Sequence, residues 1–170
     1  VVGLSLEFSE TTAAKKILAC KQENDKGSKS IKLNFDQNKQ VQGVSIDLRT
    51  LDLNETNLRS LEYPFAHIPK ISQVILTSEP TSGSQKLEKI SNLFSILFKK
   101  PQDIQDLSVS LIPTNDFAIL FNIILPQMCS LEVLTIDAVA QELSLQNFEN
   151  FTENLTMIAP KLRELKLNIS

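Results

Sequence analysis

Histidine, cysteine, glycine and tryptophan are scarce in this sequence. It contains one histidine, two cysteines, four glycines and no tryptophan among its 170 residues. A single histidine leaves little material for a metal site or for a nucleophile activated by an imidazole base. The glycines form neither G-x-x-x-x-G-K-[ST] nor G-x-G-x-x-G, the motifs that hold phosphates. We therefore expect no metal, no cofactor and no enzymatic activity.

The charge balance and the apolar runs exclude two further classes of partner. There are 17 basic and 20 acidic side chains, giving a net charge of -3, without the basic patch that a nucleic acid requires. The apolar runs, such as 123–125, are far too short to cross a membrane. A hydrophobic fraction of 42% is enough for a substantial core. We expect one domain over residues 1–170 that binds neither nucleic acid nor membrane.

The cysteines and the start of the chain bear on the compartment. Cys20 and Cys129 lie far apart in sequence and form no spaced framework, so we expect both to be buried thiols. The chain opens on Val1 rather than Met, and we expect it to be part of a longer, cytoplasmic protein. A glycosylated ectodomain remains the alternative because four N-x-S/T sequons occur, at Asn54, Asn150, Asn154 and Asn168.

A short apolar pattern recurs along the chain. The order apolar-x-x-apolar-x-apolar appears six times, starting near residues 1, 41, 71, 104, 131 and 162. Apolar residues at its fourth and sixth positions alternate with polar ones, which is the period of a strand with one buried face. Each unit is therefore predicted to begin with a short strand.

Between these strands the apolar period changes to that of a helix. Apolar residues recur at three- and four-residue steps over 87–98, which predicts an amphipathic helix. Similar spacing predicts helices over 13–20, 58–68, 117–125 and 148–158. Helix starts are expected near Ser84, Asn115 and Gln146. Helix ends are expected near Pro69, Pro101, Pro126 and Pro160, each shortly before the next strand.

The first unit is longer than the others and contains a second alternating segment. Ile31, Leu33 and Phe35 alternate with polar residues, and polar stretches stand on both sides. We interpret residues 30–36 as an inserted strand that pairs with the segment beginning at Val41, as in a hairpin. The polar stretches at 21–29 and 77–85 are predicted to be loops.

Strands and helices that alternate at this period must stack, because one unit alone cannot cover its own apolar faces. Parallel strands on one side and helices on the other, joined by right-handed crossovers, form a curved solenoid. The chain resembles a leucine-rich-repeat protein, most clearly in LEVLTI at 131–136 and LRELKL at 162–167. Its long units are similar to the ribonuclease-inhibitor-like subclass. The resemblance implies an α/β horseshoe with the parallel sheet on the concave face and helices on the convex face.

The array is divergent at one position. The family has Asn or Cys at the ninth position of each unit, whereas this sequence has none there. The residues found at that position are Ser9, Arg49, Glu79, Ile112, Val139 and Ser170.

The third, fifth and seventh positions of each unit are predicted to line the concave face, because they alternate with the buried ones. Five carboxylates and one lysine are expected there among small hydroxyl residues, which suits a basic or polar protein partner. The candidate binding residues are Glu7, Asp47, Ile75, Thr77, Asp106, Ser108, Val133, Thr135, Asp137, Glu164 and Lys166.

The single histidine and three aspartates are the only residues that could suggest catalysis instead of binding. His67 stands just before Ile68 and Pro69, where a histidine caps a helix end. Asp47, Asp106 and Asp137 are the only candidates for a carboxylate cluster, but a shallow face lacks the enclosure that tunes acidity.

Our leading prediction is therefore a non-enzymatic scaffold that binds a protein through the concave sheet face. The first alternative is a structural subunit of a large assembly, stacking through uncapped repeat ends. The second, implied by the resemblance, is a set of substrate-recognition repeats of a ubiquitin-ligase adaptor.

Overall fold

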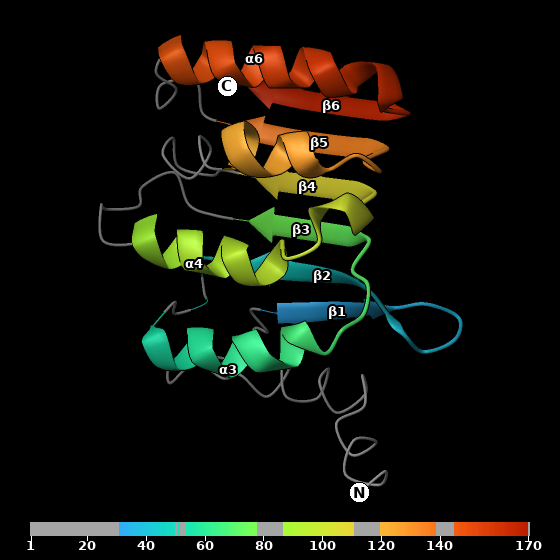
Figure 1. Cartoon of the computed structure of the whole chain (residues 1–170), viewed down its shortest axis with the longest axis vertical. Helices are drawn as coiled ribbons and strands as arrows, with labels where there is room; N and C mark the ends of the chain where they lie inside the picture. Colours follow the sequence, from blue (N-terminus) through green and yellow to red (C-terminus); the bar gives the residue numbers. More distant parts are fainter. Residues whose placement is uncertain are drawn as a thin grey trace, which may run out of the picture.

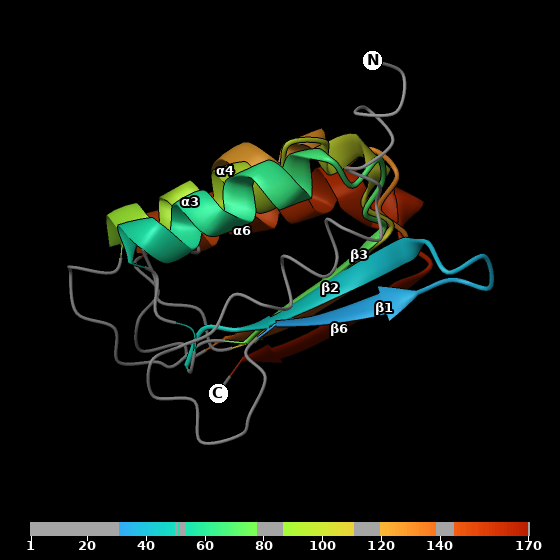
Figure 2. The same cartoon turned by 90° about the horizontal axis from the view of Figure 1, so that it is seen from below.

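A computed structural model describes residues 31–49, 51, 54–77, 87–110, 120–138 and 145–169. The strand expected at residue 1, the helix at 13–20, Glu7 and Cys20 lie outside these ranges. Within them the chain forms one sheet whose helices all lie on the same side, as Figure 2 shows. The fold class is α/β, as predicted.

The sheet has six strands that are neighbours in the same order as they follow along the chain (Figure 1). The first strand is antiparallel to the second, and the other pairs are parallel, so the sheet is mostly rather than wholly parallel. The strands are β1 (Ile31–Phe35), β2 (Val41–Asp47), β3 (Gln73–Thr77), β4 (Asp106–Ser110), β5 (Val133–Ala138) and β6 (Glu164–Ile169).

The antiparallel pair is the hairpin expected for the inserted segment. Its turn is closed by Asp36, whose Oδ1 accepts the backbone N–H groups of Asn38 at 2.8 Å and of Gln40 at 2.9 Å. Lys39 takes a left-handed conformation with φ 61°. An aspartate that satisfies the amides of the following residues is a usual way to build such a turn.

The parallel strands share one register. Gly43 of β2 pairs with Gln73 of β3, which pairs with Asp106 of β4. The row continues through Val133 of β5 to Glu164 of β6. Equivalent positions of the repeat pattern therefore lie side by side across the sheet, which keeps one face apolar on every strand.

In the described ranges, three helices and several single turns lie between these strands. The helices are α3 (Glu55–Ala66), α4 (Leu87–Leu97) and α6 (Leu145–Ile158). The turns are η2 (Pro101–Asp103), η3 (Leu120–Ile124), η4 (Leu125–Gln127) and η6 (Ala159–Lys161). The helix predicted over 117–125 is a π-helical turn where it is described, followed by a 3-10 turn.

The helix starts were predicted less well than the helices themselves. Asn54 caps α3 by accepting the backbone N–H of Asn57 at 2.8 Å, a role that the sequence had not assigned to it. Gln146 is the second residue of α6, which starts at Leu145, so it lies near a helix start as predicted. Ser84 and Asn115 lie outside the described residues. Three of the four prolines, Pro101, Pro126 and Pro160, lie in the 3-10 turns η2, η4 and η6, each after a helical segment and shortly before the next strand, as predicted.

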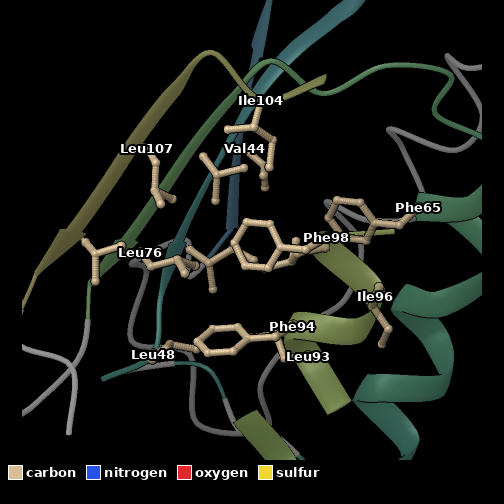
Figure 3. Close-up of a cluster of buried hydrophobic side chains, with 14 of the residues drawn as sticks. Val44, Leu48, Phe65, Leu76, Leu93, Phe94, Ile96, Phe98, Ile104 and Leu107 are labelled. Carbon is tan, nitrogen blue, oxygen red and sulfur yellow. The ribbon is translucent and has the colours of Figure 1, made fainter. Parts of the chain in front are cut away.

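The core lies between the sheet and the helices. From β2 to β5 the fourth and sixth positions of the repeat pattern are almost completely buried there, as predicted, whereas Leu165 and Leu167 at these positions of β6 are exposed. Figure 3 shows Phe94 of α4 and Phe98, the residue just after this helix, pointing toward these strand residues, and the centroids of their rings lie 5.6 Å apart in an edge-to-face contact. The buried strand residues are Val44, Ile46, Val74, Leu76, Leu107, Val109, Leu134 and Ile136.

Two individual predictions have opposite outcomes. His67 is the C-cap of α3, half-buried, with its Nδ1 2.9 Å from the carbonyl oxygen of Tyr63, so its structural role is confirmed. Cys129 is exposed, so the prediction of a buried thiol is wrong. It stands in the turn before β5, where the neighbouring Met128 and Leu131 enter the core instead.

Candidate functional site

The face of the sheet opposite the helices is the candidate site, and we call it the open face. No helix of the described ranges lies on it, as Figure 2 shows for the side of the sheet away from α3, α4 and α6. Its side chains alternate with the buried ones along each strand. They are Lys32, Asn34, Gly43, Ser45, Asp47, Gln73, Ile75, Thr77, Asp106, Ser108, Ser110, Val133, Thr135, Asp137, Glu164, Lys166 and Asn168.

The open face contains all the predicted binding residues except Glu7, which lies outside the described part of the chain. The shared register arranges them in three rows that run across the strands. The central row is Ser45, Ile75, Ser108, Thr135 and Lys166. Apart from Lys166 these side chains are half-buried, since neighbouring strands stand on both sides. The row forms a flat surface of short side chains.

Two residues of this face were missed in the sequence. Lys32 and Asn34 of β1 pair with Ser45 and Gly43, so they extend the rows by one strand. The alternation of Ile31, Leu33 and Phe35 already implied that the residues between them would point the other way. Lys32 matters most, because it places a positive charge on a face that had been predicted to be acidic.

Asp47 is held by its neighbour Arg49. Its Oδ1 accepts hydrogen bonds from the Arg49 Nε at 2.9 Å and from the Arg49 backbone N–H at 3.0 Å, and Oδ2 lies 2.9 Å from the second guanidinium nitrogen. These hydrogen bonds hold the pKa of Asp47 below its ordinary value, although partial burial opposes them. Much of the negative charge of Asp47 is therefore balanced within the molecule.

A chain of side-chain amides crosses the face along the row of Gly43, which the central row separates from Asp47. The Asn34 amide donates to Gln73 Oε1 at 3.4 Å, and Gln73 Nε2 donates to Asp106 Oδ2 at 3.2 Å. The strand between Asn34 and Gln73 contributes Gly43 at this row. A Cβ there would lie 2.9 Å from Gln73 Oε1 and 3.1 Å from the Gln73 carbonyl oxygen. The missing side chain thus makes room for Gln73 to reach both neighbours.

The far end of the face carries an ion pair within one strand. Lys166 Nζ lies 2.7 Å from Glu164 Oε1, and both groups are exposed. This contact raises the pKa of Lys166 and lowers that of Glu164. Asp137 differs from the other three carboxylates, since its carboxylate has no polar partner among the described residues. It is the carboxylate best placed to receive a cation from outside.

The carboxylates do not form a catalytic or metal-binding cluster. Asp47 and Asp137 share a row but are three strands apart, or about 14 Å at the usual strand spacing. Asp106 lies in a different row, on β4. No group of three or more histidine, cysteine, aspartate or glutamate side chains in the described ranges is placed to hold a metal ion. The arrangement offers a binding surface and no acid–base pair.

No helix in the described part of the chain has the length and apolar character needed to cross a membrane.

Comparison with known proteins adds no identity. The leucine-rich-repeat resemblance stays a prediction based on the repeat pattern. The chain matches no protein family, no curated protein and no solved structure.

Proposed function

We propose that the chain is a non-enzymatic protein-binding module of the leucine-rich-repeat kind, and that the open face is its concave binding surface. The observation that carries this proposal is the strand order. Consecutive parallel strands with every described helix on one side leave a continuous face of short polar side chains on the other side. No described helix packs on this face, so a partner can approach it closely.

Helix and strand dimensions support the solenoid part of the proposal. Neighbouring strands lie about 4.8 Å apart, whereas packed helices need about 8–10 Å. Units that stack strand on strand and helix on helix must therefore curve with the sheet inside. In Figure 1 the helices are spread more widely than the strands, with α3 lying beyond β1 and α6 beyond β6.

The contacts on the open face indicate what kind of partner surface it can bind. Arg49 balances Asp47 and Lys166 balances Glu164, so the face is of mixed charge rather than simply acidic. Half-buried Ile75 and Val133 offer apolar contact between the hydroxyl residues. We propose a polar protein surface that places a basic side chain against Asp137.

Site-specific cross-linking tests this proposal. A photoreactive residue is placed at Ser108, in the centre of the open face, or at Ser95, which is exposed on the opposite side in α4. Cells of the source organism expressing each version are irradiated, and cross-linked proteins are identified by mass spectrometry. We expect a partner from Ser108 that is absent from Ser95, with a yield reduced about tenfold by Asp137→Lys.

Ser95 is the matched control because it tests the same chemistry on the helical side. Equal cross-linking from both positions, or a yield from Ser108 that Asp137→Lys leaves unchanged at low salt, would contradict binding through the open face.

A further inference from the structure

A small apolar pocket lies on the helix side of the sheet, between the C-terminal ends of α3 and α4. Its volume is about 60 Å³, and its apolar lining includes Phe65, Ile68, Ile71, Ile96 and Leu97. Figure 3 shows Ile96 on the side of α4 that faces α3. Ile71 is half-buried and the others are buried. We call this space the α3–α4 pocket.

The pocket is better suited to an apolar group than to water. A bound water needs about 10–15 Å³ of such volume and two to four polar partners, which an apolar lining does not offer. A cavity of about 150 Å³ holds a benzene molecule, so a volume of about 60 Å³ suits the branched end of a leucine or valine side chain. Ala66 and Pro69 line the pocket and are exposed, so such a group can enter from outside.

A lysine without a partner stands beside this apolar lining. Lys99 lines the pocket, is exposed, and has no polar partner for its ammonium group among the described residues. Glu62 of α3 lies near it but forms no ion pair with it in the described ranges. Lys100 lines the pocket too, and its Nζ donates to the Pro69 carbonyl at 3.4 Å. The positive charge of Lys99 can therefore be balanced by a carboxylate from outside.

The neighbouring groove favours a peptide over a free fatty acid. The pocket shares Ile96 and Lys99 with a groove of about 290 Å³ between the two helices. The walls of this groove are charged or polar and include Glu55, Arg59 and Asn92. An acyl chain too long for the pocket would lie against these groups, whereas a peptide brings polar groups that can pair with them.

We propose that the α3–α4 pocket binds a segment of a partner protein in which a leucine or valine stands next to an aspartate or glutamate. The aliphatic side chain fills the pocket, and the adjacent carboxylate pairs with Lys99. The pocket lies on the opposite side of the sheet from the open face, so the two sites can be occupied independently.

Selection from a library of random dodecapeptides displayed on phage, with the full chain as the target, tests this assignment. We expect the enriched peptides to share an aliphatic residue next to an acidic one. Their affinity, measured by anisotropy of fluorescein-labelled copies, should fall at least about tenfold on Lys99→Glu. Replacing the peptide carboxylate by lysine should restore binding to that variant. Lys161→Glu changes the charge of an exposed lysine in η6 in the same way and should leave the affinity unchanged.

A second pair of variants tests the shape of the pocket. Ala66→Leu narrows the entrance and should weaken binding at least about tenfold, whereas Ser60→Leu, exposed elsewhere on α3, should not. Equal urea midpoints show that both variants are folded. An absence of enriched peptides, enrichment without the aliphatic–acidic pair, or equal binding to Ala66→Leu and the wild type would overturn the assignment. Octanoate that binds more tightly than every selected peptide would also overturn it, because the pocket would then belong to a fatty acid.

Discussion

Strands β5 and β6 begin from the two clearest copies of the same sequence pattern, and yet their apolar residues have opposite environments. Leu134 and Ile136 are fully buried between two neighbouring strands, while Leu165 and Leu167 are substantially exposed at the end of the sheet. The comparison teaches that burial here depends on the place of a unit in the stack more than on the unit itself. The same sequence builds the core in one place and a surface in the next.

We expect the largest effect when the same residue type is truncated in both strands. Leu134→Ala leaves a cavity between β4, β5 and the helices, and we expect it to lower the free energy of unfolding by about 3 kcal/mol. Leu165→Ala removes a side chain that water already reaches, and we expect a loss below about 1 kcal/mol. Urea denaturation of both variants measures these values. Equal losses would mean that β6 is covered in solution.

The close contact between Gly43 and Gln73 allows the inner strands and the last strand to be compared on the open face as well. Gly43→Ala forces a methyl group against the side chain and carbonyl of Gln73, and we expect a loss of about 2 kcal/mol in the free energy of unfolding. Glu164 occupies the same row at the end of the sheet, where Glu164→Ala should leave the urea midpoint unchanged. A tolerated Gly43→Ala would show that Gln73 moves aside, and the amide chain would then have no structural role.

We expect the smallest effect on the free energy of unfolding from the ion pair between Asp47 and Arg49. Asp47→Asn keeps an oxygen for the Arg49 backbone N–H but loses the charge, so we expect a loss of about 0.5 kcal/mol at pH 7. Because folding lowers the pKa of Asp47, its ion pair stabilises the fold above the ordinary pKa of 3.8, and this stabilisation disappears as the pH falls through the lowered value. The difference between the wild type and Asp47→Asn should therefore shrink progressively as the pH falls below 3.8.

The exposed pair on β6 is the matched control. Glu164→Gln should not change the urea midpoint at any of these pH values, because water replaces the contact with Lys166. A pH-dependent loss as large as that of Asp47→Asn would contradict the distinction between the two pairs.

Much of the fold could be predicted from the sequence, because period and register are set by local alternation. Val44, Ile46 and their equivalents in β3, β4 and β5 are buried in the core, as the pattern requires. The partners of the polar side chains could not be predicted in the same way. The bonds of Gln73 to Asn34 and Asp106 depend on the register of three strands and on the absence of a side chain at Gly43. The exposure of Cys129 depends on a turn that the apolar period does not describe.

The consecutive strand order has a consequence for the growing chain on the ribosome. Each described strand pairs with the one synthesised just before it, starting from the short β1–β2 hairpin, so no strand waits for a distant segment. In a stack of units, folding can begin in one unit and proceed to its neighbours. Each partly folded state then has an exposed edge strand like β6, and the next strand to form pairs with that edge.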